Sequence, residues 1–132
     1  MKLTAQHVYD VTLLITQIIN ERRPMPTKGA YRIARLHAKL LPEFNTINAQ
    51  RESMIKAYDT HHKILVGEDL VDGPEFVVPP DKLDEFTVAW KEIGETEIDI
   101  NVEPIPVADL DIAGASNITA GEFITLGDLV KE

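Results

Sequence analysis

The sequence contains no cysteine, few aromatic residues (6%) and no long apolar run. Without thiols, both a disulfide-stapled fold and a thiolate metal site are excluded. The longest uncharged apolar stretch, Val11 to Ile19, is interrupted by Thr12, Thr16 and Gln17, so it is too short and too polar to span a bilayer. The N-terminus has neither a hydrophobic signal core nor a cleavage site. These absences predict a soluble protein of a reducing compartment.

Charge is distributed unevenly along the 132 residues, whose number suits one domain. Residues 1–63 hold 10 Lys and Arg against 5 Asp and Glu, a net of +5, whereas residues 64–132 hold 3 against 17, a net of −14. Either a basic arm for nucleic acid precedes an acidic tail, or two halves face each other, or a neighbouring copy, with complementary potentials. We favour the second explanation, because the acidic half repels phosphate.

The first sixty residues have the apolar spacing of two helices. The first helix is predicted from about Ala5 to Glu21, with Thr4 as its N-cap and Pro24 as its stop. Its apolar stripe consists of Val8, Val11, Leu14, Ile15 and Ile18. The second helix begins at Thr27 and continues to Tyr58, which gives a length of about 45 Å at 1.5 Å per residue.

Pro42 lies in the middle of this second helix, where a proline removes one backbone hydrogen bond. The segment is therefore either one kinked helix or two helices that break at Leu41. We favour the kink, because the apolar stripe keeps its phase across Pro42. Residues 1–60 are thus predicted to form an antiparallel helical hairpin.

Residues 61–132 are predicted to form an acidic α+β part. Lys63–Val66 is a short apolar run, and Asp72–Pro74 is a turn signal. Phe76–Val78 is a short strand candidate that could pair with the strictly alternating segment Thr96–Val102.

A third helix is predicted between these two strands, from about Asp81 to Ile93. Asp81 is its expected N-cap and Gly94 its expected stop. The apolar face of this helix is expected to consist of Leu83, Phe86, Ala89 or Trp90, and Ile93.

The end of the chain is predicted to contain a turn of helix at Val107–Asp111 and a loop over residues 111–117. Thr119 and Glu122 have the spacing of a capping box, which Gly121 weakens. An apolar tail follows, either helical or extended, which packs onto the core or docks on a partner: Phe123, Ile124, Leu126, Leu129 and Val130. The predicted fold class is α+β: a long antiparallel helical hairpin, then a small two-stranded sheet with one short helix, and a C-terminal apolar tail.

No constellation of residues in the sequence points to catalysis. Ser53 and Ser116 stand outside any nucleophile elbow, and no glycine-rich phosphate loop is present. His61 and His62 have acidic neighbours, but adjacent helical side chains point about 100° apart and rarely reach one ion. We therefore predict no catalytic residue, no cofactor and no bound metal.

The strongest polar pattern is basic. Lys28, Arg32, Arg35 and Lys39 recur at positions i, i+4, i+7 and i+11, which places them on one face of the second helix. Arg22 and Arg23 come just before this helix. Such a stripe could follow a phosphate backbone, but no aromatic platform accompanies it. The alternative is contact with the acidic half of this chain or of a neighbour, and nucleic acid is not the expected partner.

The order of these segments resembles a family of short phage and prophage proteins of unassigned activity, encoded among virion and lysis genes. The resemblance rests on the segment Pro24–Arg35, the long helix through Gln50–Tyr58, the acidic strand Glu97–Ile100 and the segment Pro104–Leu110. It covers about residues 12–128, and Pro42 is a departure from it. The family brings no catalytic residues. It implies a phage origin and an interaction or structural role, in the virion or the host cytoplasm.

We therefore expect a non-enzymatic, virion-associated protein that forms homo-oligomers or packs on other phage structural proteins, without a membrane. Its assembly would be head to tail, the basic helix of one copy meeting the acidic half of the next. The alternative is a phage effector that binds and inhibits a host protein, with an acidic surface that mimics nucleic acid. The residues expected to make the contacts are Arg22, Arg23, Lys28, Arg32, Arg35, Lys39, Phe123, Leu126 and Leu129.

Overall fold

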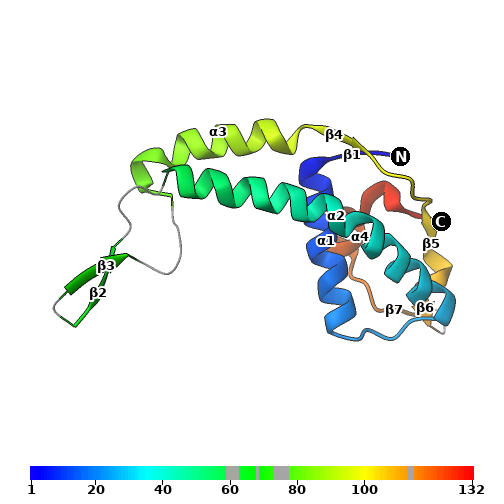
Figure 1. Ribbon diagram of the computed structural model, residues 1–132. Helices are drawn as coiled ribbons and strands as arrows, with labels where there is room; N and C mark the ends of the chain where they lie inside the picture. The colour runs from blue at the N-terminus through cyan, green and yellow to red at the C-terminus, as the bar shows by residue number, and fades with distance from the viewer. Residues whose placement is uncertain (59–62, 68, 73–77, 113–114) are drawn as a thin grey trace.

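The computed structural model describes residues 1–58, 63–67, 69–72, 78–112 and 115–132. Two parts lie one after the other along its length (Figure 1). We call residues 1–47 and 95–132 the base, which holds both chain ends, and residues 48–58 and 80–94 the arm, which projects from it. A small hairpin lies beyond the far end of the arm.

Helix α1 spans Ala5–Asn20 and confirms the first predicted helix. Thr4 caps it, because its side-chain oxygen accepts a hydrogen bond from the His7 backbone N–H at 3.1 Å. The predicted apolar stripe is the buried face of this helix. Thr12 is buried on the same face, and its hydroxyl is satisfied because it donates to the carbonyl of Val8 at 2.6 Å.

Helix α2 spans Thr27–Tyr58 without a break at Pro42, which confirms the prediction of one long helix. A proline at this position cannot donate to the carbonyl four residues earlier, and its ring crowds that turn. Such a defect commonly kinks a helix at that turn. Figure 1 shows α2 bent between its two ends rather than straight.

Helices α1 and α2 run antiparallel over the first part of α2. The rings of Tyr9 and Phe44 stack with their centroids 5.2 Å apart, and Thr16 Oγ1 lies 3.1 Å from Nε2 of His37. Earlier positions of α1 thus meet later positions of α2, as the predicted hairpin requires. However, α2 has 32 residues against 16 in α1. Beyond Ile47, the last buried residue of α2, it extends past α1 and becomes one half of the arm.

The other half of the arm is α3, which spans Leu83–Gly94 after a 3₁₀ turn, η1 (Pro80–Lys82). The prediction that Asp81 caps α3 is wrong, because Asp81 lies inside the turn and none of the described side chains caps the helix. Pro80, which fixes φ at the start of a helical turn, begins a 3₁₀ turn one residue before Asp81, and α3 itself begins only at Leu83. Leu83, predicted for the apolar face, is 51% exposed.

Aromatic rings connect the arm to the base. Trp90 of α3 meets Tyr9 of α1 edge-on at 5.6 Å, and the guanidinium of Arg51 lies 5.9 Å from the centroid of the Trp90 ring. Farther along the arm, Phe86 meets Tyr58 edge-on at 6.1 Å. These contacts place α3 antiparallel along the second half of α2, so two helices alone form the described arm.

Strand β1 (Lys2–Thr4) pairs antiparallel with β4 (Glu97–Asp99). The predicted pairing of Phe76–Val78 with Thr96–Val102 is therefore wrong for β4. Val78 lies outside any strand, and residues 76 and 77 lie outside the described part of the chain. The strand that pairs with β4 is β1, which has only three residues, too few to show a strand periodicity in the sequence.

The predicted alternation along β4 and the residues after it is confirmed. Ile100 is buried and Ile98 and Val102 are half-buried, whereas Glu97 and Asp99 are exposed. Side chains in a strand point alternately to opposite faces, so one face covers the core and the other carries the acidic groups.

A second ladder joins β2 (Lys63–Val66) to β3 (Asp69–Asp72), with Gly67 at a φ of 65° between them. Glycine adopts this left-handed conformation without steric cost. The sequence predicted only an apolar run for the first of these strands. The predicted turn at Asp72–Pro74 lies, apart from Asp72, outside the described residues.

The C-terminal part of the base consists of short elements: β5 (Ile105–Pro106), η2 (Val107–Asp109), β6 (Asp111–Ile112), β7 (Ala115–Ser116), α4 (Ala120–Leu126), η3 (Gly127–Leu129) and β8 (Val130–Lys131). The helical turn η2 was predicted. The predicted loop over residues 111–117 is corrected, because it contains the antiparallel ladder of β6 and β7. The parallel ladder of β5 and β8 places the end of the chain beside Ile105.

The predicted capping box of α4 is confirmed. The Thr119 side chain accepts from the Glu122 N–H at 3.2 Å, and the Glu122 carboxylate accepts from the Thr119 N–H at 2.9 Å. The α+β class is confirmed as well. The predicted single small sheet is replaced by four separate two-stranded ladders in the part of the chain that the structure describes.

The hydrophobic core lies in the base. The largest fully buried side chains are Val8, Val11, Thr12, Ile15, Ile18, Leu40, Leu110, Leu126 and Leu129. In the described arm, by contrast, Phe86 is the one apolar side chain classed as buried, and it stands apart from the core cluster. Among the described residues, no helix has both the length and the apolar character needed to cross a membrane.

Candidate interaction surface

The predicted basic stripe lines a groove on the base. The groove has a volume of about 480 Å³ and lies between the first half of α2 and the segment from Asn101 to Ile105. Residues from both walls line it: Lys28, Tyr31, Arg32, Arg35, Leu36, Lys39, Asn101, Val102, Glu103 and Ile105. All four cations of the stripe therefore face one shared space, as the helical spacing predicted. We call this feature the basic groove.

Two of the four cations already contact the acidic half of their own chain. Nε of Arg32 lies 3.2 Å from Oδ2 of Asp109, and Nζ of Lys39 donates to the backbone carbonyl of Asn101. Oδ2 of Asp109 is otherwise buried without a hydrogen-bond partner among the described residues, so Arg32 supplies its compensating charge. Part of the basic stripe therefore contacts the acidic half of its own chain, and the rest remains open to a neighbouring molecule.

The other two cations, Lys28 and Arg35, remain available. Both are exposed, and neither forms an ion pair with a carboxylate among the described residues. The guanidinium of Arg35 lies 5.8 Å from the centroid of the Tyr31 ring, which is itself 62% exposed. A cation over an aromatic face is held in place at little cost in solvation, so Arg35 is directed towards the groove before any partner arrives.

Gly29 allows α2 to approach η2 closely beside the basic groove. A Cβ at this position would lie 1.8 Å from the backbone carbonyl oxygen of Asp109. Only glycine permits this approach of α2 to η2, and the approach brings Asp109 within reach of Arg32. Gly29 was not among the residues predicted from the sequence to matter. The available signal was a glycine inside a segment whose other residues favour a helix.

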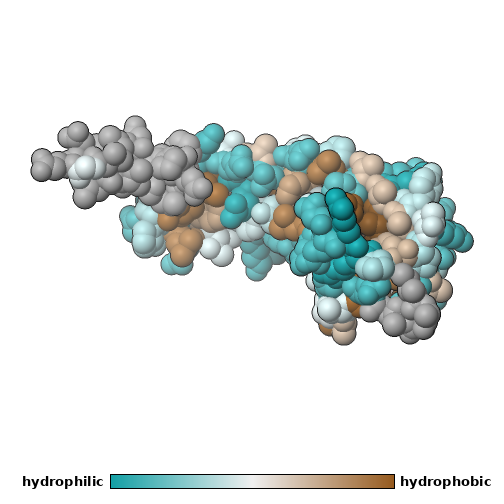
Figure 2. Space-filling model, turned by 90° about the horizontal axis from the view of Figure 1, so that it is seen from below, coloured by the Kyte–Doolittle hydropathy of each residue, from teal (hydrophilic) through white to brown (hydrophobic). Residues whose placement is uncertain are grey.

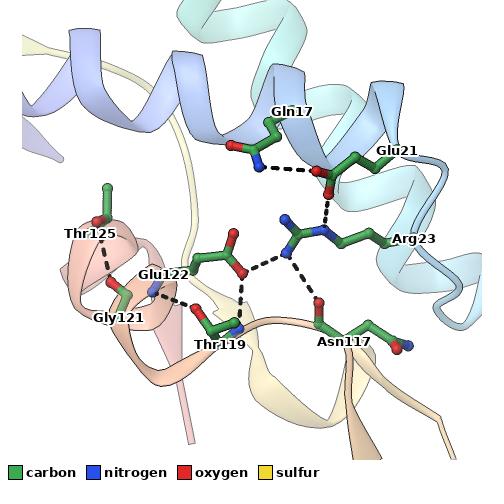
Figure 3. A network of polar contacts seen from close by, with 8 residues as sticks. All are labelled: Gln17, Glu21, Arg23, Asn117, Thr119, Gly121, Glu122 and Thr125. Carbon is green, nitrogen blue, oxygen red and sulfur yellow. Dashed lines mark hydrogen bonds and ion pairs between the residues drawn. The ribbon is translucent and has the colours of Figure 1, made fainter.

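Arg23 is half-buried and lies in a network of polar contacts within the base (Figure 3). Its Nε lies 2.6 Å from Oε2 of Glu21, and its Nη1 lies 2.5 Å from Oε1 of Glu122 and 3.1 Å from the carbonyl of Asn117. Three acceptors of its own chain thus engage Arg23, whose predicted contact with a partner stays a prediction. Arg22, with a φ of 51°, is exposed beside it.

Electrostatics explain why this internal contact is stable. Hydrogen bonds from Arg23 and from the Thr119 backbone lower the pKa of Glu122 to about 2. Hydrogen bonds from Gln17 and Arg23 lower the pKa of Glu21, and the two carboxylates raise the pKa of Arg23. The network therefore stays ionised at neutral pH and ties α4 to the end of α1.

The apolar tail is part of the core. Leu126 and Leu129 are 0% exposed, and Phe123 is partly buried against the core cluster. The expectation that these three residues dock on a partner is wrong for the two leucines, because they would have to leave the core to do so. The alternative, that the tail packs on the core, holds for them. The one large apolar side chain of α4 that is mostly exposed is Ile124, at 81%.

The remaining apolar surface is divided. Figure 2 shows separate brown patches with teal between them, one of them on the arm beside the grey residues. The large apolar side chains that are exposed are Leu13, Ile19, Tyr31, Leu83, Val88 and Ile124. Apolar side chains exposed singly are normal on protein surfaces. The basic groove, by contrast, brings four cations together in one place.

The histidines in the described part have structural contacts. Nε2 of His7 lies 2.8 Å from the carbonyl of Thr125, and His37 contacts Thr16. No group of three or more potential metal ligands occurs among the described residues. His61 and His62, the pair weighed as metal ligands, lie outside them.

No protein-family model, curated protein or solved structure significantly matches the chain. The chemistry of the basic groove and of the surfaces that could enter it is therefore the basis for a functional conclusion.

Proposed function

We propose that the protein is a non-enzymatic, virion-associated assembly component that acts through contacts with copies of itself or with other virion proteins. One observation carries this proposal: a basic groove is present on a chain whose net charge is −9. A cationic surface on a strongly anionic protein attracts acidic protein surfaces, while the rest of the chain repels polyanions such as nucleic acid.

The groove combines fixed and available cations. Arg32 and Lys39 are held by Asp109 and by the Asn101 carbonyl, whereas Lys28 and Arg35 have no carboxylate partner among the described residues. An acidic segment that enters the groove meets a charge pattern already in position, so less conformational entropy is lost on binding. Leu36, Val102 and Ile105 supply apolar contact at its walls.

Mass spectrometry of purified phage particles tests the virion role. We expect this chain to be present in particles at a reproducible copy number after extensive washing. Its absence from particles, together with its presence in the host lysate, would overturn the proposal.

That same result is what the alternative function predicts. Several carboxylates are exposed on α3 and β4, among them Asp84, Glu92 and Glu97, and such a surface can mimic nucleic acid. An effector of this kind binds a host protein and stays out of the particle. The particle measurement therefore separates the two functions.

A further inference from the structure

The outer face of α3 carries an acidic counterpart to the basic groove. Asp84, Glu92 and Glu95 are exposed, and spacings of four, four and three residues place them with Val88 on one side of the helix. Glu85 is exposed at the flank of this row. Phe86, Trp90 and Ile93 lie on the opposite side, which faces α2 and α1. We call Asp84, Glu85, Val88, Glu92 and Glu95 the acidic stripe.

The two surfaces match in length. Asp84 and Glu95 are 11 residues apart, as are Lys28 and Lys39. At 1.5 Å per residue, each row of charges extends for about 16 Å. Carboxylates along α3 can therefore meet cations along α2 without a change in the conformation of either helix.

The two surfaces also match in charge. The four groove cations are opposed by Glu103 in the lining and by Asp109 beside Arg32, which leaves a surplus of two positive charges. The four carboxylates of the acidic stripe are opposed by Lys82, 3.8 Å from Glu85, and Lys91, 3.9 Å from Glu95, which leaves a surplus of two negative charges.

Each surface contains an exposed apolar side chain among its charges. Val88 is 60% exposed within the acidic stripe, and Tyr31 is 62% exposed in the lining of the groove. Interfaces between proteins commonly surround such an apolar centre with polar groups, which align the partners. The two surfaces thus agree in length and in opposite charge, and each contains an exposed apolar side chain.

We infer that the groove binds the acidic stripe of a second copy of this chain. The inference rests on the proposed function and names the partner within it. The groove belongs to the base, and the stripe belongs to the arm apart from Glu95, which directly follows α3. The contact is therefore heterologous: each copy keeps a free groove at one end and a free stripe at the other. Assembly of this type continues into a ring or a filament.

A complementation experiment tests the inference. The groove variant is Lys28→Glu with Arg35→Glu, and the stripe variant is Asp84→Lys with Glu92→Lys. All four residues are exposed, and none forms an ion pair within the described part of the chain. Two controls carry the same changes of charge elsewhere on exposed residues: Lys2→Glu with Lys131→Glu, and Asp128→Lys with Glu132→Lys. Circular dichroism and the unfolding midpoint verify that every variant folds.

The measurement is the mass in solution by size exclusion with light scattering, at about 0.1 M salt, where charges interact over about 10 Å. We expect wild type and both controls to exceed the 14.8 kDa of one chain, and each variant alone to stay at 14.8 kDa. An equimolar mixture of the two variants should recover species of at least two chains, because one supplies an intact groove and the other an intact stripe. Salt at about 1 M should reduce the mass of wild type.

Two results would overturn the inference: wild type that stays at the mass of one chain at every concentration, or variants whose mixture fails to assemble although wild type does. The outcome is independent of the virion role. Without complementation, a chain found in particles keeps its function with a different partner. With complementation, absence from particles removes the virion role and leaves the self-contact intact.

Discussion

The base and the arm show two ways of holding a helix in place. The first half of α2 packs against α1 around fully buried side chains such as Ile15 and Leu40. The second half has no buried side chain in the described arm and is accompanied by α3 alone. Burial of apolar surface contributes roughly in proportion to its area. The base therefore carries most of the stability, and the arm depends on being a continuation of it.

The base supplies most of the stability of the protein, which leaves the surface of the arm available for recognition. Because α2 is continuous across Pro42, the arm is held at a fixed distance from the core without a large core of its own. Its outer face is free to carry charge in place of apolar residues. The same division occurs on the base. One side of the first half of α2 is buried in the core, and its solvent side carries the cations of the basic groove.

The largest expected effect contrasts one buried side chain in each part. Leu40→Ala should lower the free energy of unfolding by about 3 kcal/mol, because it leaves a cavity in a fully enclosed core. Phe86→Ala, in the arm, should lower it by about 2 kcal/mol, because Phe86 stands apart from the core cluster and its loss removes buried apolar surface without leaving an enclosed cavity. Urea unfolding measures both values.

Hydrogen exchange sharpens this first comparison. Phe86→Ala should speed exchange in residues 48–58 and 83–94 and leave the amides of α1 protected, because the arm can open locally. Leu40→Ala should speed exchange throughout. Equal losses of stability for the two variants would show that base and arm unfold as one unit.

The next effect concerns the close approach behind the groove. Gly29→Ala should destabilise the protein by about 2 kcal/mol, because the new Cβ would overlap the Asp109 carbonyl and force α2 and η2 apart. Gly121→Ala is the matched control. It lies in α4 with open space around its Cβ position, so the better helix propensity of alanine should leave the protein equally stable or slightly more so. Thermal unfolding of the two variants checks the contrast.

Local rules predicted the helices of both parts well. The i, i+3, i+4 spacing placed α1 and α2, and the Thr119–Glu122 spacing placed the start of α4, because these signals lie within a few residues of one another. Pairings between distant residues were not predictable in this way. The contact of β1 with β4 joins residues more than 90 positions apart and involves only three residues on each side.

The candidate site shows the same limit. Helical spacing alone predicted that the four cations share one face. It could not show that Arg32 meets Asp109, that Arg23 meets Glu122, or that Leu126 and Leu129 fill the core, because each depends on how distant segments pack. The acidic stripe of α3 has a regular spacing as well, but its role was visible only once the position of the buried face was known.

A smaller effect, confined to the base, depends on pH. Glu122→Gln should lower stability by about 1–2 kcal/mol at pH 7, because it removes the charged partner of Arg23. The pKa of Glu122 falls from 4.5 to about 2 on folding, so this contribution is complete above about pH 4.5 and is lost as the pH falls towards 2. The difference between wild type and variant should therefore shrink below pH 4.5.

Urea unfolding at a series of pH values measures this effect. Glu97→Gln serves as the control, because Glu97 is exposed on β4 and should give nearly no difference at any pH. A difference between wild type and Glu122→Gln that persisted unchanged to pH 2 would contradict the electrostatic explanation.

The smallest expected effect on stability belongs to Val88, on the outer face of the arm. Because this side chain is 60% exposed, Val88→Ala should change the free energy of unfolding by less than about 0.5 kcal/mol. Its effect on assembly should be larger, since burial of its methyl groups against the groove of a second copy would be lost. We expect the concentration at which half of the chains assemble to rise severalfold. Ile124→Ala, at an even more exposed apolar site outside the stripe, should leave that concentration unchanged. If both variants weakened assembly equally, the apolar contact would be unspecific and the arm would not present a defined face to its partner.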